Sequence, residues 1–272
     1  MMSEPFTQRI ALAVEYDGSA FYGWQKQLDP ALPTVQQTLE EAVAKVANHP
    51  VNIRCAGRTD AGVHATAQTV HFDTSVDRPL RAWVQGVNAH LPKTVAVRWA
   101  APTPHDFHAR HSALARTYRY VICNRDQRLG VGHAQFTWER HPLDAKAMHR
   151  AAQALLGERD CSAFRAAGCQ SSTPMRNVMS VAVQRREDWV VLEITANAFL
   201  LHMVRNIAGS LMAVGRGEQA EDWIARLLTA ADRNLSAPTA PPNGLYLVAV
   251  RYSPGCHLPS LPKGPLFLPD VL

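Results

Sequence analysis

The chain has 272 residues, of which 47% are hydrophobic, and a formal net charge of +5. This length suits two domains or one large one, and the apolar fraction excludes a disordered chain. The start, MMSEPFTQRI, holds no apolar segment of signal-peptide length, no later run is long enough to cross a bilayer, and the five cysteines form no C-x-x-C pair. We therefore expect a cytoplasmic protein without membrane contact, disulfide framework or cysteine zinc site.

The first half predicts the order strand, helix, strand, strand, helix, strand. Apolar residues alternate over Gln8–Tyr16, which indicates a strand. Thr34 and Gln37 form a capping box that begins a helix over Thr34–Asn48. The other elements expected here are strands at Val51–Ala56, Ala67–Asp73 and Thr94–Trp99 and a helix at Arg78–Asn88.

The second half repeats this order. We expect strands at Arg116–Cys123, Val178–Arg185, Trp189–Ala196 and Gly244–Tyr252, and helices at Asp144–Leu156, Met203–Val214 and Asp222–Ala230. The pattern predicts an α+β fold of two ferredoxin-like lobes, a duplicated split βαβ unit, forming an extended mixed or antiparallel sheet with helices on one side and a central cleft. The lobes would be residues 1–110 and 111–252, followed by a proline-rich tail at 253–272.

Positive charge is concentrated in the second half. Residues 1–110 carry ten basic and ten acidic side chains, whereas residues 111–272 carry 18 and 13. Of the 28 basic residues 23 are arginine, which binds phosphate through paired N–H groups and stacks on bases. This bias fits a nucleic-acid partner and an arginine-rich genome composition about equally well, so charge alone decides nothing.

A lone carboxylate, Asp60, lies in the stretch AGRTDAGVHA between two expected strands. An aspartate two residues before a glycine is ordinary turn chemistry, because aspartate accepts backbone N–H bonds and glycine takes positive φ. The loop is nevertheless longer than a tight hairpin and almost without apolar anchors. A functional carboxylate and a plain turn both remain open at this point.

A second unusual residue is Arg205, which follows the apolar run Phe199–Val204 in the first turn of an expected helix. The helix dipole opposes a cation there, and burying it unpaired would cost several kcal/mol. One explanation is an ion pair within its own lobe, for example with Glu193. The other is that Arg205 reaches the cleft and pairs with Asp60, which would keep that carboxylate ionised and oriented.

Tyrosine and arginine side chains alternate in the stretch HARHSALARTYRY, with Tyr118 and Tyr120 on one strand face beside Arg110 and Arg116. Such a surface can stack on bases and bind phosphates. Alternatively, both tyrosines belong to the core and the arginines to a solvated face.

Several stretches together resemble the tRNA pseudouridine synthase A family. They are YDGSAFYGWQ (Tyr16–Gln25), GRTDAGVHA (Gly57–Ala65), FHARHSALARTYRY (Phe107–Tyr120), FLLHMVRNIAGSL (Phe199–Leu211) and GLYL (Gly244–Leu247), in the family's order. The resemblance covers Ile10 to about Tyr252. It does not include the tail, and it gives His202 no role.

The resemblance implies a homodimer that isomerises uridine to pseudouridine at positions 38, 39 and 40 of the tRNA anticodon stem-loop, without cofactor or metal. Asp60 matches the catalytic aspartate and Arg205 its partner. Arg58 matches the loop arginine linked to base extrusion, Tyr118 the residue stacked on uracil, and Leu245 an apolar residue of the pocket.

This chemistry suits a single carboxylate. Breaking the N1–C1′ bond develops positive charge on the sugar, which Asp60 could stabilise, attack, or relieve by taking the C2′ proton. A hydrolase would need a second acid to activate water, whereas water would destroy the intermediate of an isomerase. Arg58 and Tyr118 would stabilise a uridine that has left its stack, and second-half arginines would bind phosphates.

Two other functions fit parts of the sequence. A non-catalytic RNA-binding protein is one, although the chain lacks the RNP1 pattern and a binder needs no buried Asp–Arg pair. A metalloenzyme is the other, because His105, His108 and His111 recur every third residue, and His64 and His71 lie near the Asp60 loop in the sequence. Three-residue spacing makes a clean ligand set on neither a helix nor a strand, and Arg110 would repel a cation.

Overall fold

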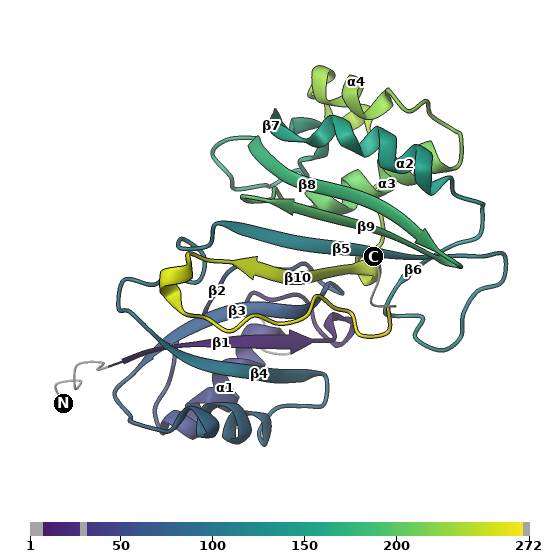
Figure 1. Cartoon of the computed structure of the whole chain (residues 1–272). Helices are drawn as coiled ribbons and strands as arrows, with labels where there is room; N and C mark the ends of the chain where they lie inside the picture. Colours follow the sequence, from purple (N-terminus) through teal and green to yellow (C-terminus); the bar gives the residue numbers. More distant parts are fainter. Residues whose placement is uncertain (1–7, 28–31, 269–272) are drawn as a thin grey trace. The chain divides into compact units, whose positions relative to one another are not determined.

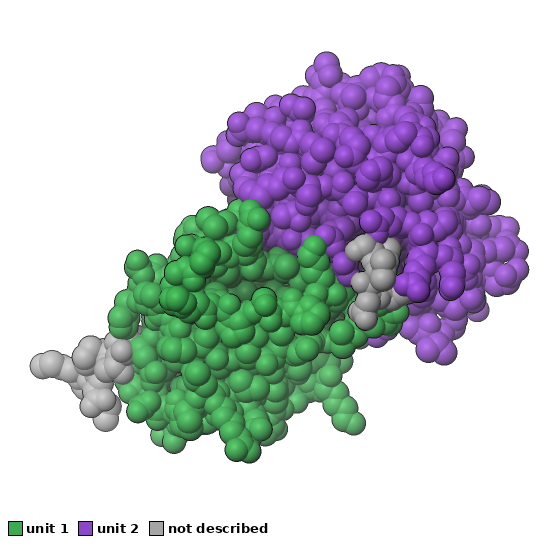
Figure 2. All heavy atoms as spheres, in the orientation of Figure 1, with its two compact units in different colours: residues 1–114, 247–268 green, residues 115–246, 269–272 purple. Residues whose placement is uncertain are grey.

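The computed structural model of the chain describes residues 8–27 and 32–268. It is an α+β protein with a mixed sheet of ten strands and several helices (Figure 1), which confirms the predicted fold class. Within the described ranges no helix is both long and apolar enough to cross a membrane. The chain divides into two compact units (Figure 2): unit 1 is Met1–Leu114 with Leu247–Leu268, and unit 2 includes Ala115–Tyr246.

Unit 1 is built around β1, which pairs antiparallel with β3 on one side and β4 on the other, while β2 pairs with β3. Its elements are β1 (Gln8–Tyr16), α1 (Val35–Ala47), β2 (Arg54–Cys55), β3 (His64–Thr74), a π-helical turn (Ala82–Gly86) and β4 (Val95–Thr103). The Thr34 hydroxyl accepts a hydrogen bond from Gln37 N at 3.4 Å, and Asn48 ends α1 in the left-handed conformation, so this predicted helix is confirmed.

Strand β2 is shorter than the predicted Val51–Ala56. The backbone at Ile53 bonds to side chains of α1 instead of a neighbouring strand: its N–H donates to the Glu40 carboxylate at 3.1 Å, and its carbonyl accepts from Gln36 at 3.4 Å. A strand ladder cannot use groups that are already bonded elsewhere. The chain therefore enters the following loop from a two-residue strand.

Both faces of β1 are covered, because Ile10 to Val14 are all at most 1% exposed. On one side Ala11 packs with Phe107 and Ala109, against the partly buried Cys256 and Leu258 of the tail. The proline-rich segment after β10 thus packs on unit 1 as far as the buried Leu268.

In unit 2 the strand order is β5-β9-β8-β7, all antiparallel, with β6 parallel to β5. The elements are β5 (Ala115–Asn124), β6 (Thr137–Glu139), α2 (Ala145–Ala152), β7 (Gly157–Asp160), β8 (Met175–Arg186), β9 (Trp189–Ala196), α3 (Met203–Gly215) and α4 (Trp223–Ala230). Helix α2 packs on β8 and α3. The last strand, β10 (Leu245–Arg251), begins in unit 2 and ends in unit 1. The duplicated ferredoxin-like arrangement stays a prediction.

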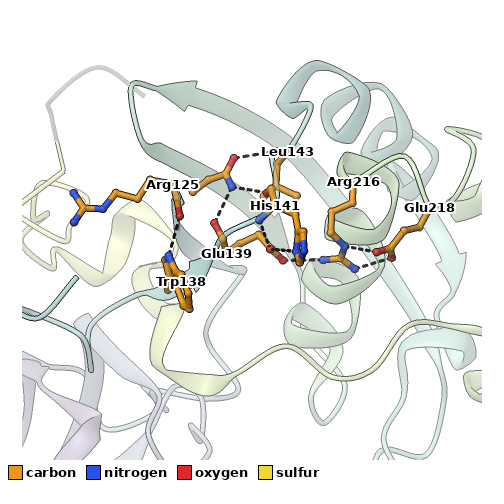
Figure 3. Close-up of polar contacts among 8 residues, drawn as sticks. Arg125, Trp138, Glu139, His141, Leu143, Arg216 and Glu218 are labelled. Atoms are coloured by element: carbon orange, nitrogen blue, oxygen red, sulfur yellow. Dashed lines mark hydrogen bonds and ion pairs between the residues drawn. The ribbon is translucent and has the colours of Figure 1, made fainter. Parts of the chain in front are cut away.

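A polar network fixes β6 and the chain that follows it (Figure 3). The Asn124 amide donates to the carbonyls of Glu139 and His141, at 2.9 and 2.7 Å. The Glu139 carboxylate accepts from Arg216 at 2.9 Å, and Arg216 also pairs with Glu218. Because Arg216 caps the C-terminus of α3, the network connects that helix through Glu139 of β6 to Asn124 at the end of β5. Neither β6 nor β7 was predicted, since strands of three or four residues are too short for a clear alternation.

Candidate active site

Asp60 lies on the loop between β2 and β3 in unit 1. Its side chain is half-buried, and the neighbouring Arg58 is exposed. Thr59 between them is buried, and the Asp60 carbonyl accepts a hydrogen bond from Val63 N at 3.1 Å, which closes the turn. Ordinary turn chemistry therefore accounts for the backbone of Asp60 and leaves its carboxylate on a partly open surface.

The loop is braced by the chain that follows β1, which is the first of the stretches singled out in the sequence. Trp24 N donates to the Thr59 carbonyl at 3.0 Å, and Gly62 N donates to the Phe21 carbonyl at 3.4 Å. The backbone of Gly18 and Gly23 lies against the loop too. A Cβ on Gly18 would come within 2.0 Å of the Val63 carbonyl oxygen, so only glycine permits this approach.

Tyr118 lies on β5 in unit 2 and is 8% exposed. Its ring meets Phe199 edge-on, with 5.0 Å between centroids and an interplanar angle of 82°. Phe199 belongs to the segment between β9 and α3, so the same segment that leads to Arg205 also contacts the Tyr118 ring. Tyr120, two residues along, is fully buried, and its hydroxyl bonds to Thr137 and to the Pro241 carbonyl. Tyr120 is therefore a core residue.

Arg205 is half-buried in the first turn of α3. Its Nε donates to the Ala240 carbonyl at 2.8 Å, and Ala240 N donates back to the Arg205 carbonyl at 3.2 Å. Glu193, the alternative partner within unit 2, forms an ion pair with Arg119 at 2.8 Å. A backbone carbonyl thus supports the guanidinium of this half-buried arginine, and Glu193 has a different cation as its partner.

The remaining candidates differ in exposure. Arg116 is 9% exposed, and its guanidinium donates a hydrogen bond to the Asn197 carbonyl at 2.8 Å within unit 2. Arg110 is exposed, and Leu245 is buried at the start of β10. Asp60, Arg58 and Arg110 belong to unit 1, whereas Tyr118, Arg205, Arg116 and Leu245 belong to unit 2. The pairing of Asp60 with Arg205 joins residues of different units and stays a prediction.

Two of the histidines that suggested a metal site accept hydrogen bonds from backbone N–H groups. His71 Nδ1 accepts from Ala109 N at 3.1 Å, and His108 Nδ1 accepts from Arg110 N at 3.1 Å. The His108 ring meets that of His71 edge-on and that of His111 at a tilt, with centroids 4.7 and 4.3 Å away. Across residues 8–27 and 32–268, no three histidine, cysteine or acidic side chains are grouped so as to hold a metal ion.

Comparison with known proteins gives a consistent result. A family model described as tRNA pseudouridine synthase matches residues 12–112 and 151–253. The tRNA pseudouridine synthase A of Shewanella amazonensis is 56% identical over 96% of this chain and 100% of that protein. The enzyme of the same name from Vibrio cholerae is 55% identical over 97% of this chain and 99% of that protein. A chain of a Cbf5-Nop10-Gar1 complex aligns at 9% identity over 87% of this chain and 57% of that chain. Its TM-score of 0.33 is too low to carry an inference.

An α+β chain with this match is an enzyme of the RNA-modifying class, an isomerase. More particularly, it belongs to the tRNA pseudouridine synthase family, which confirms the resemblance read from the motifs. The motifs alone did not indicate that Phe199 supports Tyr118, or that Tyr16 and Gln68 bond to the Asp60 loop at Thr59 and Gly57. Phe199 and Tyr16 lie within the quoted stretches, whereas Gln68 follows them on β3 and had no signal of its own.

Proposed function

We propose that this protein isomerises uridine to pseudouridine at positions 38, 39 and 40 of the tRNA anticodon stem-loop, with Asp60 as the catalytic residue. The observation that carries the proposal is a half-buried carboxylate on a loop whose backbone is held by a second segment of the same unit, in a chain of this family. A fixed carboxylate is what a developing sugar cation requires.

The reaction rearranges bonds without net gain or loss of atoms. The N1–C1′ bond breaks, the uracil turns, and C5 bonds to C1′; C5 then loses its proton to solvent and N1 takes one. Asp60 acts at the sugar, where positive charge develops as the first bond weakens. No second acid is required, because no water has to be activated.

The other residues bind and orient the target nucleoside. Tyr118 stacks on the extruded uracil, and Phe199 holds the Tyr118 ring at its edge. Arg58, exposed two residues before Asp60, stabilises the extruded state, in which unstacking costs a few kcal/mol. Arg205 pairs with Asp60 and keeps it ionised, with its Nε already held by the Ala240 carbonyl.

Three further residues complete the proposal. Leu245 contributes an apolar wall that helps to exclude water from the pocket, in keeping with its burial at the start of β10. Arg110 and Arg116 bind phosphates of the stem-loop. The protein acts in the cytoplasm as a homodimer and needs neither cofactor nor metal, so full activity is expected in EDTA.

The test is tritium release from tRNA transcripts that carry C5-tritiated uridine. Transcripts with uridine replaced at positions 38, 39 and 40 in turn assign the target positions. Asp60→Asn should lower turnover by at least about a thousandfold while tRNA binding persists, because the amide is neutral but nearly the same shape. Asp77→Asn, which alters an exposed acid of the same unit, should leave turnover unchanged.

Three outcomes would count against the proposal. Near-normal turnover by Asp60→Asn would remove Asp60 from the mechanism. Release from a transcript lacking uridine at all three positions would place the target elsewhere. Binding without release from any tRNA by the wild-type protein would favour an RNA-binding protein.

A further inference from the structure

A buried polar cluster lies directly beneath the Asp60 loop, formed by Tyr16, Thr59 and Gln68; we name it the Tyr16 cluster. The three residues are 2%, 7% and 0% exposed. They come from the end of β1, the loop itself and β3. The β1–β3 register places Tyr16 opposite Ala65, just after the loop, which brings the phenol to the base of the loop.

Hydrogen bonds connect the cluster to the loop at two points. The Tyr16 hydroxyl lies 2.8 Å from the Thr59 hydroxyl, and Gln68 Nε2 donates to the Tyr16 oxygen at 3.4 Å. The Gln68 amide also spans the backbone of Gly57, accepting from its N–H at 3.3 Å and donating to its carbonyl at 2.5 Å. The loop is therefore held on both sides of the exposed Arg58.

Thr59 is the residue immediately before Asp60, so its position sets where the Asp60 backbone begins. Its side chain is held by Tyr16 and its carbonyl by Trp24 N at 3.0 Å. The loop is largely polar, so these hydrogen bonds are what hold its backbone in one conformation. A displacement of about 1 Å at a catalytic group can cost about a hundredfold in rate.

We infer that Tyr16 and Thr59 are positioning residues that hold the Asp60 carboxylate in its reactive place. This inference rests on the proposed function, in which Asp60 is catalytic. The two hydroxyls lie 2.8 Å apart and brace the loop from beneath, so we assign both residues a role through the loop backbone. Their loss should therefore lower kcat and leave the KM for tRNA unchanged.

The experiment compares Tyr16→Phe, Thr59→Val and the double variant with Thr74→Val. Thr74 is a matched control, because it is a fully buried threonine at the far end of β3, whose hydroxyl lies 2.9 Å from His49 Nε2 and accepts from Val76 N at 3.2 Å. Each change removes one buried hydroxyl in unit 1. Tm, kcat and KM are measured for every variant, with Asp60→Asn alongside.

Both single variants should lose at least about tenfold in kcat with KM within about twofold, whereas Thr74→Val keeps kcat at a similar loss of Tm. The double variant leaves no unpartnered hydroxyl of the Tyr16–Thr59 pair, so Tm should partly recover while kcat stays low.

Wild-type kcat in both single variants would overturn the inference, as would a kcat that recovers together with Tm in the double variant. If Asp60→Asn is inactive and the single variants are fully active, only the positioning role fails. If Asp60→Asn is itself active, the proposed function fails instead.

Discussion

Arg205 and Ala240 bond to each other twice, although 35 residues separate them. The guanidinium Nε donates to the Ala240 carbonyl at 2.8 Å, and Ala240 N donates to the Arg205 carbonyl at 3.2 Å. One guanidinium nitrogen is thus committed to the protein's own backbone. The orientation of Arg205 is consequently fixed by the segment that leads to β10 as well as by α3.

Arg205→Ala should abolish turnover and lower stability, because it removes both the proposed partner of Asp60 and the donor to Ala240. Arg205→Lys should fold better and still turn over poorly, since a single ammonium cannot donate to the Ala240 carbonyl and fork onto a carboxylate. Tritium release and thermal unfolding measure the two effects. Near-normal turnover in both variants would contradict the pairing with Asp60.

A second prediction concerns Gly209, on α3 one turn after Arg205. A Cβ there would lie 2.3 Å from the Pro238 carbonyl oxygen, so an alanine must push away the segment that carries Ala240. Glycine to alanine inside a helix ordinarily stabilises by about 1 kcal/mol. Here we expect destabilisation by roughly 1–3 kcal/mol, because the site is already filled, together with lower kcat.

Gly130→Ala is the control for Gly209→Ala, because a Cβ at Gly130 would have no neighbour within 4 Å. It should change the free energy of unfolding by no more than about 0.5 kcal/mol. Urea unfolding of both variants decides the matter. A Gly209→Ala protein more stable than the wild type would show that the segment carrying Pro238 and Ala240 moves at no cost and does not fix Arg205.

Local signals in the sequence predicted several elements well. β1 and β9 have the expected bounds, Thr34 caps α1 as predicted, and α2 begins after Asp144, whose side chain caps it. In each case the determining interactions lie within four residues, or depend on a simple alternation. The candidate loop at Asp60 was found for the same reason, since its length and composition are visible locally.

Other features depend on residues far apart and left no local trace. The Tyr16–Thr59 bond spans 43 residues and requires the register of β1 on β3. Strand β2 was predicted too long because two side chains of α1 take the backbone bonds of Ile53. We expected a carboxylate as the partner of Arg205, whereas its Nε donates to the carbonyl of the distant Ala240.

A pH dependence follows from His71, which is 4% exposed and accepts a hydrogen bond from Ala109 N. Burial lowers the pKa of His71 to about 4, with further lowering by His108 and Arg9. Asp73 opposes this shift, and Arg54 adds slightly to it. The folded protein therefore favours the neutral ring, whereas the unfolded chain binds a proton near the ordinary histidine pKa of 6.5.

Stability supplied by this group is complete above about pH 6.5 and is lost as the pH falls from 6.5 towards 4, by on the order of 2 to 3 kcal/mol. His71→Asn keeps an acceptor for Ala109 N but cannot titrate, so its unfolding free energy should depend less on pH in that window. The comparison is urea unfolding between pH 4 and 7, with the exposed His133→Asn as control. Parallel pH profiles for wild type and His71→Asn would refute the assignment.

The charge asymmetry predicts how tRNA binding responds to salt. The whole net charge of +5 comes from residues 111–272, and Arg128, Arg140 and Arg186 of unit 2 are exposed. An arginine that neutralises a phosphate releases a counterion, so each contact contributes about 0.7 to 0.9 to the slope of log affinity against log salt. Changing these arginines to glutamine, one at a time, should flatten the slope by up to that amount.

Arg78→Gln is the matched control, because it removes an exposed arginine from unit 1, where basic and acidic residues balance over residues 1–110. Affinity is measured by filter binding with unmodified tRNA between roughly 50 and 300 mM salt, a range over which such slopes can be resolved. Arginines that contact phosphate should weaken binding and flatten the slope together, whereas loss of a merely solubilising charge should do neither. An unchanged slope in all three unit 2 variants would place the phosphates on other residues of the protein.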